Sequence, residues 1–331
     1  MNYQRFAVLG ANSFAGQAFI AHTLAEGAQI IGFNRSAEGS EIFLPYRSLA
    51  RGGMYQFFKA DINQDLDLIM AELDQFRPQV VVDFAGQGMV AESWQNPEQW
   101  YLTNIVSKVR LHNQLRQRDW LERYIRISTP EVYGSQSSLS KESWQYNPST
   151  PYAVSHAAID MSLRAFHQQY GFPVIFTRHA NFFGPSQQLY RIIPRTIIYA
   201  LTGRKLQLQG GGTSQRAFIY GSDVAEGILR ATEMGVVGDS YHFSSDRFLT
   251  IRQVVEIICE RLAVSFESLV ELAPDRPGKD QAYLMDSSKA RDTLGWKDSV
   301  CFEEGIDATI AWVKSSLNEI HKLPLSYIHK A

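Results

Sequence analysis

The chain has 331 residues, of which 45% are hydrophobic and 20% charged, and its formal net charge is −2. These values predict a globular protein with one large domain or two fused lobes. The charge excludes the broad basic surface that nucleic-acid binding requires, although a local basic cluster can still hold a small phosphorylated ligand.

Cysteine content and apolar runs indicate where the protein works. Cys259 and Cys301 have no metal-type spacing, so we expect neither a metal site nor a disulfide framework, and we expect the reducing cytoplasm. The first apolar segment starts at Phe6, which leaves no room for a signal peptide. No apolar run has transmembrane length, so no membrane partner is expected.

The first half of the chain alternates short apolar strands with helical patterns. The expected strands are Phe6–Leu9, Gln29–Phe33, Gln79–Phe84, Tyr124–Ile127 and Pro173–Thr177. The expected helices are Ser13–Glu26, Leu66–Gln75, Pro97–Arg118 and Tyr152–Tyr170. This alternation predicts an α/β protein, with a Rossmann-type doubly wound parallel sheet in a dinucleotide-binding lobe at residues 1–180.

The second half is less regular. A helix at Arg195–Leu201, a strand at Lys205–Gln209 and a glycine-rich loop precede strands at Phe218–Tyr220 and Tyr241–Ser244, which enclose a helix at Val224–Met234. We expect both strands, within residues 214–247, to return to the main sheet. Residues 181–213 and 248–331, which include a loop around Pro274–Asp280 and a final helix at Phe302–Asn318, are predicted to form a smaller α/β substrate-binding lobe.

A glycine-containing turn follows the first strand and opens the first helix. Gly10 permits the tight turn, Gly16 allows close packing of helix on sheet, and Ser13 is placed to cap the helix or touch phosphate. An ordinary strand–helix turn is the alternative, but the context favours a pyrophosphate site at the helix N-terminus. The expected cofactor contacts here are Gly10, Asn12, Ser13, Phe14, Ala15 and Gly16.

Three further segments are expected to border the dinucleotide. The second strand ends in Asn34-Arg35-Ser36, which has no acidic residue for the ribose hydroxyls and therefore leans slightly toward a 2′-phosphate and NADP over NAD. Arg35 as a solvated loop residue is an equally good interpretation. Asp61 and Ile62 are expected beside the adenine, and Phe84-Ala85-Gly86 lets the backbone approach the cofactor.

With these residues placed, the chain resembles the extended short-chain dehydrogenase/reductase family, the NAD-dependent epimerases and dehydratases. Among them it is most similar to nucleotide-sugar 4,6-dehydratases of the dTDP-glucose type. The matching features are the glycine loop, Phe84-Ala-Gly-Gln87, Asn104, Ser128–Gly134, Tyr152, Asn181-Phe-Phe-Gly-Pro185, Arg216, Asp275-Arg-Pro-Gly278, Tyr283, Asp286, Lys289 and Leu294-Gly-Trp296.

The resemblance implies a reaction and roles for particular residues. A retained NAD(P) takes a hydride from C4 of a hexose, water leaves across C5 and C6, and the hydride returns to C6. Tyr152 would accept the C4 hydroxyl proton, Thr129 would hold that hydroxyl, and Glu131 would remove the C5 proton. His179 would contact the cofactor and Gln87 the substrate.

Two positions depart from the family pattern. His156 stands where a lysine binds the nicotinamide ribose and supplies positive charge, one helical turn from Tyr152. Imidazole is mostly neutral near pH 7, so it lowers the tyrosine pKa less than a lysine would. Pro130 stands where dTDP-glucose dehydratases carry an aspartate that protonates the leaving hydroxyl. Either Glu131 serves both steps, water substitutes, or the reaction differs.

The resemblance also implies a substrate and an assembly. Arg191, Arg216 and Arg276 match positions that hold the diphosphate of a nucleoside-diphosphate hexose, and Asn181 matches an amide that contacts it. The helices Pro97–Arg118 and Tyr152–Tyr170 match those that form an intersubunit four-helix bundle, which implies a homodimer.

The leading hypothesis is a nucleotide-sugar 4,6-dehydratase. A same-family epimerase or decarboxylase is the nearest alternative, and Glu131 and Asp275-Arg-Pro-Gly278 favour the dehydratase over it. A member that binds dinucleotide and sugar nucleotide without turnover is a third possibility, supported by His156 and Pro130.

Overall fold

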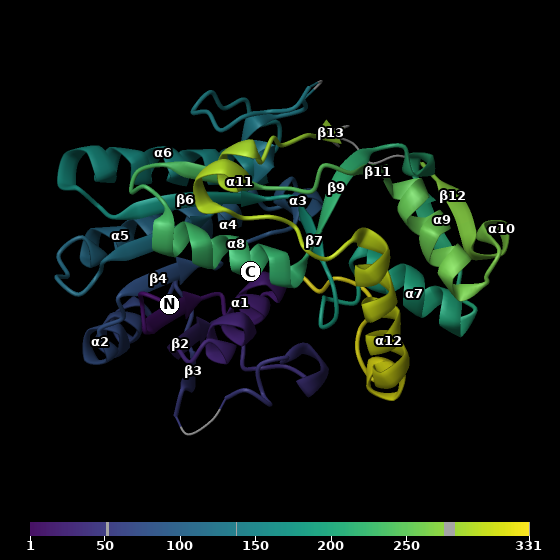
Figure 1. Ribbon diagram of the computed structural model, residues 1–331, viewed down its shortest axis with the longest axis horizontal. Coiled ribbons are helices and arrows are strands. Elements are labelled where there is room, and N and C mark those ends of the chain that lie inside the picture. Colours follow the sequence, from purple (N-terminus) through teal and green to yellow (C-terminus); the bar gives the residue numbers. More distant parts are fainter. Residues whose placement is uncertain (51–52, 137, 275–281, 331) are drawn as a thin grey trace.

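The computed structural model, which describes residues 1–50, 53–136, 138–274 and 282–330, contains a large lobe built on a parallel sheet and a smaller lobe beside it (Figure 1). The sheet strands are β1 (Arg5–Leu9), β2 (Gln29–Asn34), β3 (Tyr55–Lys59), β4 (Val80–Asp83), β5 (Arg123–Ile127), β6 (Val174–His179) and β10 (Ser240–Phe243). They pair in the order β10-β6-β5-β4-β1-β2-β3, and every pairing is parallel. The strand order reverses between β1 and β4, and in such sheets ligands bind at the carboxyl ends of the strands beside that point.

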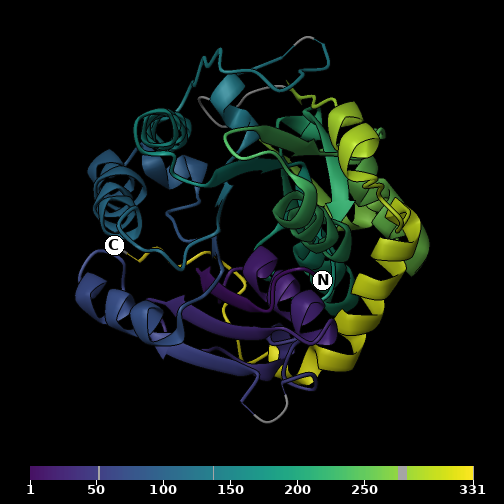
Figure 2. The ribbon, with the colours of Figure 1, turned by 60° about the vertical axis from the view of Figure 1, so that its left-hand side comes forward.

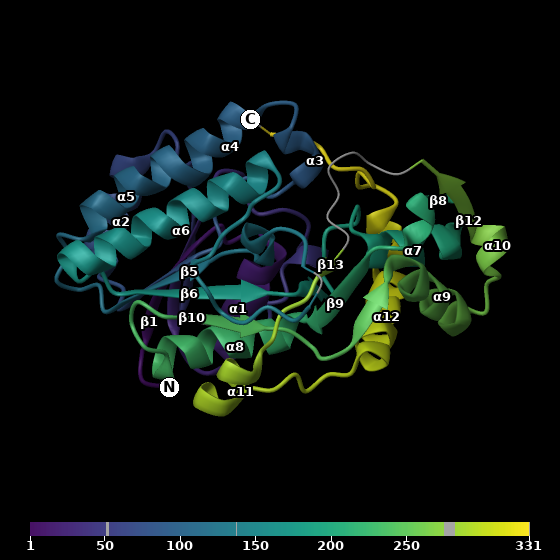
Figure 3. The same ribbon diagram turned by 90° about the horizontal axis from the view of Figure 1, so that it is seen from above.

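Helices cover both faces of the sheet (Figure 3). One face carries α1 (Phe14–Ala25), α8 (Gly221–Met234) and α11 (Ser288–Leu294), and the other carries α2 (Leu66–Phe76), α5 (Lys108–Leu115) and α6 (Pro151–Tyr170). Successive strand side chains point to opposite faces. Phe6 and Val8 therefore pack into one core, while Ala7 and Leu9 pack into the other. This arrangement confirms the predicted doubly wound α/β class.

The expected helix at Pro97–Arg118 is a composite. It consists of α4 (Pro97–Tyr101), a π-helical stretch η2 (Leu102–Ser107) and α5, and the short helix α3 (Val90–Ser93) precedes it. Wide π turns of this kind, inside longer helices, are frequent at functional sites. Two 3-10 turns, η1 (Glu41–Phe43) and η3 (Pro130–Tyr133), lie in the loops after β2 and β5.

The smaller lobe has its own sheets. Its strands are β7 (Asn181–Phe183), β8 (Leu206–Gln209), β9 (Gln215–Tyr220), β11 (Phe248–Thr250), β12 (Val270–Ala273) and β13 (Ala282–Tyr283), and its helices are α7 (Ile192–Thr202), η4 (Gly210–Gly212), α9 (Ile251–Leu262), α10 (Phe266–Leu269) and α12 (Phe302–Ile320). β9 pairs with β7, β11 and β13, whereas β8 pairs with β12.

The expectation that Phe218–Tyr220 rejoins the main sheet is wrong, because these residues lie in β9. Ala217, Phe218 and Ile219 are all buried, and so an unbroken apolar run does not reveal which of two sheets it belongs to. The expectation for Tyr241–Ser244 is confirmed, since β10 pairs with β6. Within the described ranges, no helix is long and apolar enough to cross a membrane.

The end of the chain returns to the large lobe. After α12, residues 321–330 run back to the first lobe, so the end of the chain lies beside α4 (Figure 2). We call residues 323–330 the tail. The predicted second lobe of 248–331 includes two segments that contact the first lobe: α11 packs against β10 and α8, and the tail is hydrogen-bonded to Gln87, Gln99 and Ser36.

Candidate active site

The turn between β1 and α1 has the geometry of a phosphate loop. Gly10 has a φ of +77°, and a Cβ there would lie 2.6 Å from the backbone nitrogen of Ala85. A Cβ on Gly16 would lie 2.7 Å from the Gly10 carbonyl oxygen. Ser13 caps α1, because its Oγ accepts a hydrogen bond from the Gly16 amide at 3.0 Å. Two obligatory glycines at a capped helix start are the features that let pyrophosphate approach the backbone closely.

A cavity of about 670 Å³ opens from this turn. That volume falls in the usual range for cofactor and ligand sites. Most of the predicted dinucleotide contacts line it, namely Gly10, Asn12, Ser13, Asn34, Arg35, Ser36, Asp61, Ile62, Phe84, Ala85 and Gly86, together with Gln87. The structure thus brings together at one cavity residues from the carboxyl ends of β1, β2, β3 and β4.

Other predicted cofactor residues lie behind or beside this cavity and do not line it. Phe14 and Ala15 are buried in α1 with Gly16, and the Phe14 ring stacks on Phe182 with centroids 5.6 Å apart. His179, at the end of β6, stacks on Phe243 at 6.0 Å. Burial lowers its pKa to about 3, so the ring is neutral, and its Nε2 has no hydrogen-bond partner among the described residues. Such an unsatisfied buried nitrogen fits a site that a ligand completes.

The tail forms a wall of the cavity that the sequence did not predict. Its lining residues are Leu323, Pro324, Ser326, Tyr327, Ile328 and Lys330. The Lys330 ammonium donates to Ser36 Oγ at 2.8 Å, while the Lys330 carbonyl accepts from Gln87 Nε2 at 2.8 Å. The predicted substrate contact Gln87 is therefore hydrogen-bonded to the tail in this structure.

The tail is also held by an aromatic contact. The imidazole of His329 stacks on buried Trp100, with ring centroids 5.4 Å apart and an interplanar angle of 5°. Its Nε2 lies 2.6 Å from Gln99 Oε1. These contacts fix the tail to α4, beside the cavity.

The predicted catalytic residues lie on two adjacent elements. Thr129 caps η3, and its Oγ1 accepts from the Glu131 amide at 3.3 Å. Tyr152 and His156 lie on α6, which Thr150 caps by accepting from the Ala153 amide at 3.1 Å. The ring centroids of Tyr152 and His156 are 4.6 Å apart. Pro130 occupies the first position of η3, so it shapes the turn that presents Glu131.

The surroundings of Tyr152 favour its neutral form. Burial raises its pKa well above the ordinary value of 10, and the nearby carboxylate of Glu131 raises it further. A hydrogen bond from Thr129 and the charges of Arg191 and Arg126 act in the opposite direction. Both Thr129 and Glu131 therefore lie near this phenol.

His156 is held by a residue beneath it. The Nη2 of Arg126, on β5, lies 3.0 Å from the Nδ1 of His156. A guanidinium only donates, so Nδ1 accepts and the imidazole proton resides on Nε2. Burial and the charge of Arg126 lower the pKa of His156 well below 6.5, which makes the ring neutral.

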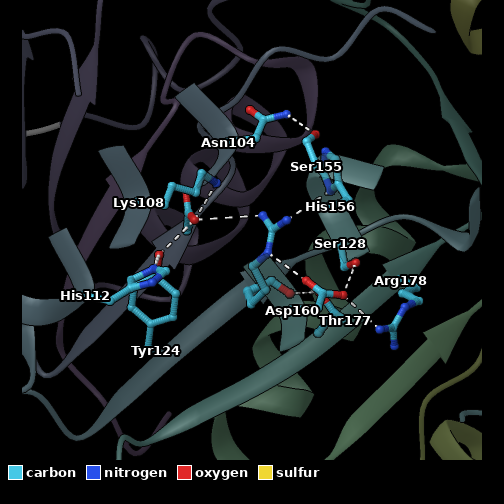
Figure 4. Close-up of polar contacts among 12 residues, drawn as sticks. Asn104, Lys108, His112, Tyr124, Ser128, Ser155, His156, Asp160, Thr177 and Arg178 are labelled. Carbon is cyan, nitrogen blue, oxygen red and sulfur yellow. Dashed lines mark hydrogen bonds and ion pairs between the residues drawn. The ribbon is translucent and has the colours of Figure 1, made fainter. Parts of the chain in front are cut away.

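Arg126 belongs to a buried ionic network (Figure 4). Its Nε donates to Asp160 at 3.0 Å, and its Nη1 lies 3.9 Å from Asp83. Arg178 donates to Asp160 at 2.9 Å, and Lys108 donates to Asp83 at 2.6 Å. Ser128 also donates to Asp160, and Tyr124 donates to Asp83 at 2.8 Å. We call Asp83, Lys108, Arg126, Asp160 and Arg178 the ionic network; each is at most 1% exposed.

Asn104 ties the cofactor side to the catalytic helix. From η2 it donates through Nδ2 to Ser155 Oγ at 3.0 Å and to the Gln87 carbonyl at 3.1 Å (Figure 4), and its Oδ1 accepts from the Gln87 amide at 2.8 Å. The π turn thus places one amide between the end of β4 and α6.

The predicted substrate contacts border the second lobe. Arg191 immediately precedes α7 and is exposed, and its positive charge acts to lower the pKa of Tyr152. Asn181 is exposed at the start of β7. Arg216, on β9, lies 4.4 Å from the ring centroid of Tyr283. Arg276 and the rest of Asp275-Arg-Pro-Gly278 lie outside the described residues.

The family follows from comparison with known proteins. The sequence profile of the family described as GDP-mannose 4,6 dehydratase matches residues 8–309. The chain belongs to this family.

Relatives of this dehydratase-family chain match it over nearly its whole length. The dTDP-glucose 4,6-dehydratase of Xanthomonas campestris pv. campestris is 32% identical over 324 residues, which cover 92% of each chain. That of Haemophilus influenzae is 31% identical over 331 residues, which cover 92% of this chain and 96% of its own. These matches confirm the resemblance to nucleotide-sugar 4,6-dehydratases.

Solved structures of a dehydratase and an epimerase are also similar to this chain. DesIV, a dTDP-glucose 4,6-dehydratase from Streptomyces venezuelae with NAD and TYD bound, has a TM-score of 0.88 at 29% identity, covering 96% of this chain and 98% of its own. A UDP-glucose 4-epimerase from Thermus thermophilus in complex with NAD has a TM-score of 0.84 at 26% identity, covering 95% of this chain and 100% of its own.

In this dehydratase-family chain, two contributors to the site were not predicted from sequence. One is Arg126. A basic residue inside the apolar strand Tyr124–Ile127 indicates that this residue is buried and has a buried acidic or polar partner. The other is the tail, whose short mixed sequence carries no local pattern that points to a binding surface.

Proposed function

We propose that this protein is a nucleotide-sugar 4,6-dehydratase that keeps its dinucleotide through the reaction. The observation that carries the proposal is the joint placement of Tyr152, Thr129 and Glu131, since both neighbours act on the phenol of Tyr152. This elimination needs two proton acceptors: a base that takes the proton of the C4 hydroxyl, and a carboxylate that takes the proton from C5.

Each of these side chains has a separate task. When bound, the nicotinamide dinucleotide accepts a hydride from C4 of the sugar and returns it at C6. Tyr152 takes the proton of the C4 hydroxyl, and Thr129 orients that hydroxyl by hydrogen bonding. Glu131 takes the C5 proton, which the C4 ketone makes acidic.

The C6 hydroxyl must leave as water, so it needs a proton. Pro130 cannot supply one, because its side chain carries no exchangeable hydrogen. Glu131 has just gained the C5 proton and lies one residue away. We propose that Glu131 returns this proton to the departing hydroxyl, so that one carboxyl serves both halves of the elimination.

The residues present fit a dinucleotide. Gly10 and Gly16 leave room for the pyrophosphate, Asp61 and Ile62 line the adenosine side, and His179 offers an unsatisfied Nε2. The neighbouring structures contain NAD. Arg35 and Lys330 both line the cavity with Ser36, and these cations support binding of the extra phosphate of NADP as well.

The substrate class is a nucleoside-diphosphate hexose. Arg191 and Arg216 are candidates for the diphosphate, with Asn181 beside them. The relatives that match act, by name, on dTDP-glucose or UDP-glucose.

We also propose a cytoplasmic homodimer. Exposed apolar side chains gather on two neighbouring stretches, α4–η2 and α6; they are Tyr101, Leu102, Val106, Val154 and Met161. An apolar patch across two helices of an otherwise polar surface marks a protein interface. Both cysteines are free thiols, which suits a reducing compartment.

The function is tested by incubating the protein with dTDP-, UDP- and GDP-hexoses and following the products by mass spectrometry. We expect one sugar to yield a product lighter by one water, with no net consumption of dinucleotide. A product of unchanged mass but altered C4 configuration would show an epimerase, and loss of carbon dioxide from a uronate would show a decarboxylase. Binding of dinucleotide and sugar nucleotide without any product would show a non-catalytic member.

A further inference from the structure

The proposed base has no charged partner on its own helix. Tyr152 must lose a proton during the reaction, yet burial and Glu131 both raise its pKa. His156, one turn away, is neutral because burial and neighbouring cations lower its pKa. The positive charge that stabilises a phenolate therefore has to come from another element.

β5 supplies such a charge directly beneath α6. The guanidinium of Arg126 is 1% exposed and donates to His156 Nδ1 at 3.0 Å. This contact fixes the imidazole as the Nε2–H tautomer, and its ring centroid lies 4.6 Å from that of Tyr152. One side chain thus orients His156 and sets its tautomer.

The charge of Arg126 is not cancelled by its own ion pairs. The ionic network contains three cations and two carboxylates, because Asp160 is shared with Arg178 and Asp83 with Lys108. One formal positive charge therefore remains in a water-poor region under α6, where Coulomb interactions are strong. The other groups that act on Tyr152 are Thr129 and Glu131 at η3 and Arg191 at the start of α7.

We propose that Arg126 is a positioning residue: it locks His156 as the Nε2–H tautomer and supplies, through the protein interior, the positive charge that stabilises the phenolate of Tyr152. The proposal rests on the proposed function, in which Tyr152 is the base. In this arrangement His156 offers its Nε2–H to the ligand while the charge lies on the strand below.

A purely structural role for Arg126 is the competing explanation. Arg178 provides the matched control, because it is equally buried and shares the same carboxylate of Asp160. Its guanidinium donates to Tyr146, however, whereas that of Arg126 donates to His156. Loss of either arginine disturbs the ionic network, but loss of Arg126, whose charge acts on Tyr152 directly, should change the titration of Tyr152 more.

The first experiment compares Arg126→Gln with Arg178→Gln, using the sugar nucleotide turned over by the wild type. For Arg126→Gln we expect the acid-limb pKa of kcat/KM to rise by about one unit, with about a tenfold loss near neutral pH. For Arg178→Gln we expect a lower melting temperature with a clearly smaller shift of the acid limb. An unshifted limb in Arg126→Gln, or equal shifts in both variants, would overturn the proposal.

The second experiment moves the charge. His156→Lys alone places an ammonium against Arg126, so we expect activity to fall about tenfold or more. Adding Arg126→Gln removes the conflict, and the double variant should recover most of the lost kcat/KM. A rate increase in His156→Lys alone would show that Arg126 does not supply the charge.

A third measurement needs no turnover and therefore separates this proposal from the proposed function. Nitrogen NMR of histidine-labelled protein, assigned with His156→Gln, should show His156 as a single Nε2–H tautomer that does not titrate between about pH 8 and pH 5. An Nδ1–H tautomer, or titration near the ordinary histidine pKa of about 6.5, would refute the proposed contact. If no sugar nucleotide is turned over, the proposed function is refuted. The NMR result still shows whether Arg126 fixes the tautomer of His156.

Discussion

Glu131 influences Tyr152 before it performs any chemistry of its own. Its negative charge raises the pKa of the phenol, so the two proton acceptors of the site work against each other in the resting protein. The conflict has a use in an ordered reaction. In the proposed mechanism Tyr152 is neutral once it has taken its proton, and the carboxylate of Glu131 can then remove the C5 proton without a second negative charge beside it.

This conflict predicts an unusual phenotype for Glu131→Gln. Removal of the carboxylate should make Tyr152 easier to deprotonate, so oxidation at C4 should be preserved, while the dehydrated product should fall by about 10²- to 10⁴-fold. Near-ultraviolet absorbance of the reduced dinucleotide and mass analysis of the sugar measure the two steps separately.

Glu142→Gln is the matched control. Glu142 is also partly buried, but it accepts a hydrogen bond from the His242 amide at 2.8 Å, a contact that glutamine can keep. Normal dehydration by Glu142→Gln is expected. Normal dehydration by Glu131→Gln would remove Glu131 from the mechanism.

Among the structural elements, the sequence predicted those whose conformation depends on neighbouring residues in the chain. The β1–α1 turn was predictable because its backbone allows only glycine at positions 10 and 16. The assignment of β9 to the main sheet failed because apolar strands of two sheets have the same composition. The π turn around Asn104 was missed because one wide turn hardly alters helical periodicity.

The site shows the same limit. Thr129, Glu131, Tyr152 and His156 were placed together by their motif, and the structure brings them together. The contact between Arg126 and His156 joins residues on different elements, thirty positions apart. Such a pairing depends on strand register and helix position, which no single segment of sequence encodes.

The tail leads to a prediction about cofactor retention. Deletion of residues 323–331 removes a wall of the cavity and the hydrogen bonds to Gln87, Gln99 and Ser36. The deletion opens the cavity to solvent on that side, so we expect dinucleotide affinity to fall about tenfold, or about 1.4 kcal/mol, mainly through faster dissociation. Stopped-flow and calorimetric titrations with NAD and NADP measure this.

Point variants distinguish the effect of the Lys330 charge from the effect of the tail as a part of the cavity lining. Lys330→Ala should weaken NADP more than NAD, because only NADP carries a 2′-phosphate for the ammonium to meet. Lys322→Ala removes an exposed lysine that pairs with Glu319 instead, and it should change neither affinity. Tighter binding after tail deletion would show that the tail competes with the dinucleotide.

For the whole molecule, the exposed apolar residues on α4–η2 and α6 predict assembly. Met161 is 61% exposed, and a charge there should oppose the proposed interface. We expect Met161→Glu to shift the protein from dimer to monomer in analytical ultracentrifugation. Leu272→Glu is the control, because Leu272 is 68% exposed but lies on β12 in the other lobe. A wild-type monomer, or a dimer unaffected by Met161→Glu, would contradict this arrangement.

The return of the tail also links the folding of the two lobes. Ser36 and Lys330 are 294 positions apart in sequence, and Gln87 and Lys330 are 243 apart. Contacts of such long range form late, because the chain between them must first be ordered. The cavity is therefore completed only after α12 has packed onto the second lobe. A dinucleotide that touches the tail then stabilises the native state of both lobes, since its binding energy is lost if either one unfolds.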